Sequence, residues 1–173
     1  MRTLIVYYSM GGDVEKIAKK VGEGIGADVE QLKPVKSISK VTAAIGAATG
    51  QGVAIEPLRV NPKDYDQIII GSPVWAGSVA TPVNQFLKEY DVAELVKGIF
   101  TSSAGGDGHG AVQKLYKKLP NLKYVLTNIY ASKKEQSAFN GERIDRYIDV
   151  INDVGVSGSN TDSFGQENQE ESE

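Results

Sequence analysis

The sequence predicts an α/β fold: one three-layer α/β/α sandwich built on a five-stranded parallel sheet. Two observations support this. Short runs rich in Ile, Val, Tyr and Phe alternate with stretches whose apolar residues recur at helical spacing, the pattern of a parallel sheet covered on both faces. The chain also has 173 residues, 40% of them hydrophobic, which suits one domain with a full core. We expect this domain to span residues 1–154.

The five expected strands are the short apolar runs, taken in chain order. They lie at residues 3–8, 28–32, 67–71, 97–102 and 122–127. The helices between them each carry one apolar stripe, which we assign to the core and not to cofactor contact. The stripes are Val14, Ile17, Ala18, Val21 and Ile25; Val83, Phe86, Leu87 and Tyr90; Val112, Leu115, Tyr116 and Leu119; and Ile144, Tyr147, Ile148 and Ile151.

Two stretches give weaker patterns. Between the second and third strands, Ile38, Val41, Ile45 and Ala48 indicate a helix that its many small neighbours make poor by propensity. Residues 22–27 have the glycine spacing of a dinucleotide-binding turn, but they follow a helix, whereas that mechanism needs a strand, a turn and then a helix. We interpret this second stretch as the end of the first helix.

Composition narrows the classes of function. The chain has no cysteine, which excludes disulfides, thiolate catalysis and cysteine-based metal sites. No run approaches the ~20 apolar residues of a membrane span, and the N-terminus shows no signal-peptide pattern. We therefore expect a cytoplasmic protein that does not bind membranes.

Charge is unevenly placed along the chain. The net charge is −3, but residues 155–173 hold five acidic residues and no basic one, so residues 1–154 carry about +2. This nearly neutral domain offers no broad basic face for nucleic acid. The acidic tail lacks apolar residues, and we expect it to be flexible.

The first candidate binding segment follows the first strand. Ser9-Met10-Gly11-Gly12-Asp13-Val14 forms a glycine turn that opens a helix, where free N–H groups and the helix dipole favour a phosphate. Simple capping of the helix by Asp13 is the alternative.

The second candidate segment, residues 71–82, holds the only tryptophan. We expect a Gly- and Pro-rich loop that interrupts the third strand and places Trp75 as a platform for a flat ligand, although an indole that only covers hydrophobic surface is the alternative. The third segment, residues 102–110, is a glycine-rich loop after the fourth strand. It contains His109, the only histidine, which either contacts a ligand or is simply exposed.

Together the three segments resemble the flavodoxin-like family, over about residues 1–152 and most specifically over residues 68–87. The resemblance implies strand order 2-1-3-4-5 and FMN at the switch point between strands one and three. It implies that the first segment wraps the phosphate, the second stacks on the isoalloxazine ring, and the third reaches its pyrimidine edge. The implied FMN-binding residues are Ser9, Met10, Gly11, Gly12, Asp13 and Val14; Pro73, Val74, Trp75, Ala76 and Gly77; and Ser103, Ala104, Gly105, Gly106 and His109.

The first segment departs from the family's pattern Ser/Thr-x-Thr-Gly-x-Thr. Only Ser9 keeps its hydroxyl, and Asp13 adds a negative charge where a dianion should sit. Two missing donors, at roughly 1.5–3 kcal/mol each, would weaken binding by two to four decades if nothing compensated. We therefore expect FMN binding that is loose.

Three functions remain open, with no catalytic residue or metal ligand assigned. The first is electron transfer with a redox partner protein or a small acceptor, in which Gly77 could flip its peptide toward the flavin N5. The second is an FMN-dependent NAD(P)H:quinone-type oxidoreductase, favoured by a ring face that no third-segment aromatic covers. The third is a flavin-less interaction module, favoured by the altered first segment.

Overall fold

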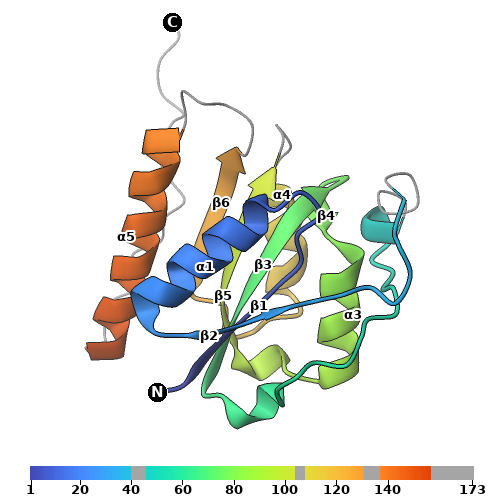
Figure 1. The fold of residues 1–173 in the computed structure, drawn as a ribbon, viewed down its shortest axis with the longest axis horizontal. Coiled ribbons are helices and arrows are strands. Elements are labelled where there is room, and N and C mark those ends of the chain that lie inside the picture. The colour runs from blue at the N-terminus through green and yellow to red at the C-terminus, as the bar shows by residue number, and fades with distance from the viewer. Residues whose placement is uncertain (40–45, 104–107, 131–136, 157–173) are drawn as a thin grey trace, which may run out of the picture.

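Residues 1–39, 46–103, 108–130 and 137–156 are described by a computed structural model (Figure 1). Five parallel strands form the sheet in the order β2-β1-β3-β5-β6, which confirms the predicted fold class and the 2-1-3-4-5 order of the main strands. An additional two-residue strand, β4, pairs antiparallel with β3 outside this order. The strands are β1 (Thr3–Tyr7), β2 (Asp28–Gln31), β3 (Gln67–Trp75), β4 (Ser78–Val79), β5 (Val96–Ser103) and β6 (Tyr124–Tyr130).

Helices cover both faces of the sheet (Figure 1). They are α1 (Asp13–Ile25), α3 (Thr81–Tyr90), α4 (Gly108–Tyr116) and α5 (Ser137–Val156), with 3-10 turns η1 (Pro62–Asp64) and η2 (Ala93–Leu95). Successive side chains of a strand point to opposite faces. Leu4 of β1 therefore packs in one core cluster with α3 and α4, while Ile5 packs in the other with α1 and α5. Among the described helices, none is both long and apolar enough to span a membrane.

The third strand is longer than the sequence predicts. The expected loop from Gly71 is wrong, because β3 continues through Trp75. Pairing with β5 explains the difference: Gly71, Ser72 and Pro73 lie opposite Phe100, Thr101 and Ser102. A Cβ on Gly71 would collide with the Phe100 ring, so the glycine serves close packing within the sheet and does not break the strand.

Other boundaries follow local rules. Gly26 ends α1 in the left-handed conformation, with φ 66°, which confirms residues 22–27 as a helix end. Of the weak helix expected around residues 38–48, residues 46–48 are helical and Ile38 is not, while Val41 and Ile45 lie outside the described residues. The predicted acidic tail covers residues 155–173. Gly155 and Val156 belong to α5, and residues 157–173 also lie outside the described residues.

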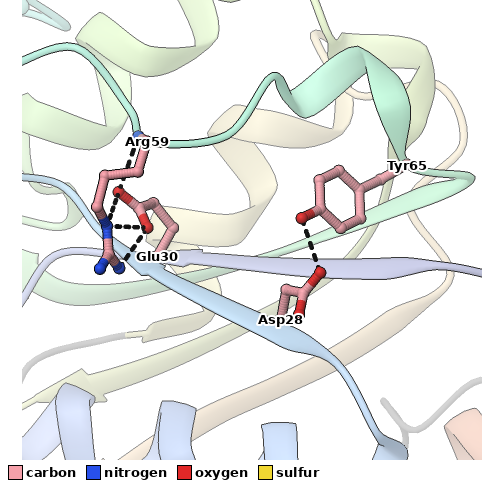
Figure 2. Close-up of polar contacts among 4 residues, drawn as sticks. All are labelled: Asp28, Glu30, Arg59 and Tyr65. Carbon is pink, nitrogen blue, oxygen red and sulfur yellow. Dashed lines mark hydrogen bonds and ion pairs between the residues drawn. The ribbon is translucent and has the colours of Figure 1, made fainter.

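The outer edge of β2 is tied to the segment that precedes β3 (Figure 2). Arg59 donates to both carboxylate oxygens of Glu30, with its Nη2 2.7 Å from Oε2, and the Arg59 amide donates to Oε1 at 3.2 Å. Tyr65 donates its hydroxyl to Asp28 at 2.8 Å. Burial by itself would raise the pKa of Glu30, but the hydrogen bonds and charge of Arg59 outweigh it and hold this pKa below its usual value.

Candidate functional site

The segments singled out in the sequence meet at the carboxyl edge of the sheet. β1, β3 and β5 are neighbours and parallel, so the segments that follow them emerge side by side. The chain leaves β1 for the β2 side of the sheet and leaves β3 for the β5 side. The point between β1 and β3 is therefore the switch point, where open α/β sheets bind ligands.

The first segment leaves the N-terminus of α1 open. Gly12 is its N-cap residue, with φ 88°, and no side chain caps the helix. Ser9 Oγ accepts a hydrogen bond from the Gly12 amide at 3.0 Å, which closes the turn and leaves the hydroxyl proton to donate. The amides of the first helical turn, residues 13–15, have no acceptor within the helix. This turn can bind an anion through its backbone.

Side chains in this segment contribute less. Val14 is buried in the core with α1 and α5, while Met10 is exposed. Asp13 does not cap the helix, so the capping alternative is wrong. Its carboxylate lies beside Gly11 instead: Oδ2 is 3.7 Å from the position that a Cβ on Gly11 would take. A bound phosphate would therefore meet a negative charge.

The second segment is a tight hairpin. Trp75 pairs with Ser78 across a two-residue turn, in which Ala76 (φ 48°) and Gly77 (φ 64°) are both left-handed. Such a turn suits the twist of the paired strands and is usually made by Asn or Gly. Ala76 is therefore strained, by about 1–2 kcal/mol. Strain of this kind is typical of ligand-binding segments.

Trp75 stands on an aromatic neighbour. Its indole is half-buried and meets Tyr8 edge to face, with ring centroids 5.4 Å apart. Tyr8 is buried, and burial raises the pKa of its phenol, so this neighbour stays neutral. The indole thus lies between the core and the surface, beside the first segment.

Three side chains that the sequence did not single out fasten the hairpin. The buried Ser72 hydroxyl accepts from the Ala80 amide at 2.9 Å and donates to the Pro73 carbonyl at 2.9 Å. Lys114 of α4 donates from Nζ to Ser78 Oγ at 2.8 Å. The only sequence signal was a pair of serines flanking the tryptophan, and nothing local pointed to a lysine 36 residues away.

The third segment is shorter than predicted. β5 continues to Ser103, which is buried, and α4 already begins at Gly108, because pairing with β6 extends the strand to that point. His109 is therefore a helical residue; it is exposed, and its Nε2 lies 3.4 Å from Thr127 Oγ1. Ala104, Gly105 and Gly106 lie outside the described residues.

Comparison with known proteins agrees with this architecture. The profile of the family described as Flavodoxin matches residues 47–141, a range that includes the hairpin but not the first segment. The chain is 33% identical to NAD(P)H dehydrogenase (quinone) 3 of Rhizobium meliloti over 121 residues, 63% of this chain and 55% of that enzyme. It thus spans little more than half the length of that relative.

Solved structures share the fold. A putative flavoprotein from Bacteroides eggerthii superposes with a TM-score of 0.65 at 21% identity, over 87% of this chain and 98% of that one. A flavoprotein from Lactobacillus acidophilus, solved in complex with FMN, superposes with a TM-score of 0.56 at 25% identity, over 81% of this chain and 98% of that one.

Proposed function

The chain belongs to the flavodoxin family, and from this premise we propose that it binds FMN at the carboxyl edge of β1, β3 and β5 and transfers electrons. The FMN complex of the L. acidophilus flavoprotein supports this choice of cofactor. Bound FMN would supply one- or two-electron chemistry, while the protein positions it and sets its potential.

The residues of the edge fit this group. The amides at the start of α1 and the Ser9 hydroxyl would hold the phosphate, and Trp75 with the Ala76-Gly77 turn would lie against the ring. The observation that carries the proposal is the uncapped N-terminus of α1 beside the Trp75 hairpin, on neighbouring strands of one edge. The full proposed set is Ser9 to Val14, Pro73 to Gly77, Ser103 to Gly106 and His109.

The test is a titration of the purified chain with FMN, followed by visible absorbance and tryptophan fluorescence. We expect saturable binding and quenching of Trp75. Because Asp13 and the missing hydroxyls weaken the phosphate contacts, we expect an affinity below that of a complete phosphate loop. Absence of saturation at millimolar FMN would contradict the proposal and favour the flavin-less interaction module.

A second candidate is an FMN-dependent NAD(P)H:quinone oxidoreductase, favoured by the R. meliloti relative. Its electron source and acceptor would be small molecules, whereas an electron carrier would use a partner protein. We propose a cytoplasmic location for either, since the cytoplasm supplies reduced nucleotides. Steady-state oxidation of NADPH with a quinone, measured on FMN-loaded protein, separates the two: a carrier shows no turnover without its partner.

A further inference from the structure

A cavity of about 240 Å³ lies beside the hairpin that carries Trp75. It is half open to solvent and is lined by residues 47–50, by β4, by Asn84 of α3, and by α4 with the turn that follows it. Ser78 and Val79, the two residues of β4, both line it. None of the contacts proposed for FMN uses this space, although it adjoins the same turn.

One side of the cavity is cationic. Lys114 in α4 and Lys118 in the following turn both line it, and no carboxylate is among the described lining residues. Lys114 uses one of its three N–H donors in the hydrogen bond to Ser78. Within the described part of the chain, neither Lys114 nor Lys118 forms an ion pair. Ammonium groups without a paired acid favour an anion beside them.

The rest of the lining is mixed. Ala47, Val79 and Leu115 contribute hydrocarbon, and Thr49 and Asn84 contribute polar groups. A ligand that fills this cavity would combine an uncharged ring with a strongly anionic group. Such a combination is found in nucleotides, whose bases and diphosphates are joined by a sugar.

We propose that this cavity binds the diphosphate-bearing part of a nucleotide electron donor, with Lys114 and Lys118 holding the phosphates. This inference rests on the second candidate function, the NAD(P)H:quinone oxidoreductase, because a nucleotide bound here would reduce the neighbouring flavin. The hydrogen bond from Lys114 to Ser78 holds this ammonium against the hairpin. Lys114 would therefore stabilise the hairpin and bind the phosphates at the same time.

The test uses calorimetric titration of the FMN-loaded chain with ADP-ribose, a redox-inactive probe that carries the diphosphate, and separately with inorganic pyrophosphate. We expect saturable binding of ADP-ribose, weakened at least fivefold by Lys114→Gln and by Lys118→Gln. Lys117→Gln is the matched control: it removes the same charge next to Lys118 but does not line the cavity, and it should change the affinity less than twofold.

Ser78→Ala separates charge from structure, because it removes the hydrogen bond to Lys114 and keeps the ammonium. Because Ser78 also lines the cavity and holds Lys114, this variant should weaken ADP-ribose binding, but less than Lys114→Gln does. A loss as large as that of Lys114→Gln would mean that Lys114 acts through the hairpin and not on the phosphates. Absence of saturable ADP-ribose binding would overturn the proposal, as would equal losses in all three lysine variants, which would indicate diffuse surface attraction. Binding of pyrophosphate without ADP-ribose would also overturn it, since the site would then take free phosphates only.

Repeating the ADP-ribose titration without FMN keeps the two proposals distinguishable. Saturable binding that depends on Lys114 and Lys118 in a chain that fails to bind FMN would support the cavity and refute the flavoprotein. If the chain binds FMN but its affinity for ADP-ribose is unchanged by Lys114→Gln and Lys118→Gln, the flavoprotein is supported and the cavity proposal is refuted.

Discussion

Trp75 and Tyr8 meet edge to face, with ring centroids 5.4 Å apart and ring planes at 79°. The contact joins the last residue of β3 to the residue that follows β1, so it bridges the switch point of the sheet. Because Tyr8 is buried against the core, it gives the indole a fixed support.

Replacing Trp75 should weaken FMN binding. Trp75→Ala removes a stacking partner worth about 0.5–1.5 kcal/mol along with its buried area, so we expect at least a tenfold loss of affinity. Trp75→Phe keeps an aromatic face and should retain most of it. The measurement is absorbance titration of the three proteins. Equal affinities would show that the indole only covers core.

Removing the charge of Asp13 should strengthen FMN binding. Asp13→Thr eliminates repulsion at the phosphate and restores a hydroxyl donor, so we expect about tenfold tighter binding, equivalent to 1.4 kcal/mol. The same change removes an acid from the first turn of α1 and should lower stability by about 0.3–1 kcal/mol.

Asp13→Thr should thus raise the affinity for FMN and lower the stability of the protein. Glu15→Gln is the matched control. Glu15 lies in the same helical turn but pairs with Lys19 at 2.7 Å, and its loss should lower stability without tightening FMN. If both variants bound FMN alike, net charge and not the position of Asp13 would govern affinity.

The two turn residues of the hairpin should respond in opposite directions. Ala76→Gly relieves a left-handed alanine and should stabilise the protein by up to about 1 kcal/mol. Gly77→Ala imposes the same strain and should destabilise the protein by about 1 kcal/mol. Backbone strain is the only cost, because the atom nearest to the new Cβ, Lys114 Nζ, is 3.9 Å away and does not clash. Urea denaturation measures both. Destabilisation by Ala76→Gly would mean that its methyl group makes packing contacts that outweigh the strain.

The ion pair of Glu30 with Arg59 should make stability depend on acid pH. The pKa of Glu30 is lowered in the folded protein, so its contribution is fully present above the unfolded value and is lost as pH falls through the folded value. Glu30→Gln should therefore be less stable at pH 7 but lose less stability between about pH 5 and pH 3. Glu23→Gln, exposed on α1, should follow the parent across that range. Parallel curves for parent and Glu30→Gln would contradict this role.

The order of the elements was predictable because it rests on periodicity within short segments. The length of β3 was not, because Gly71 and Pro73 disfavour a strand locally, while pairing with β5 keeps them in one. The start of α1 followed from Gly11 and Gly12, which leave the helix uncapped. The contacts that Tyr8 and Lys114 make with the hairpin could not be predicted from the sequence, because only the folded sheet brings these residues together.

The position of Trp75 at the end of a strand affects the kinetics of ligand binding. Trp75 ends β3, its turn has two residues, and the flanking Ser72 and Ser78 are hydrogen-bonded. Few residues of the hairpin need to become ordered when the flavin ring binds, so the conformational entropy cost of binding is small for this segment. Association should then proceed in a single phase at the encounter rate, and differences in affinity among variants of this hairpin should fall on the dissociation rate.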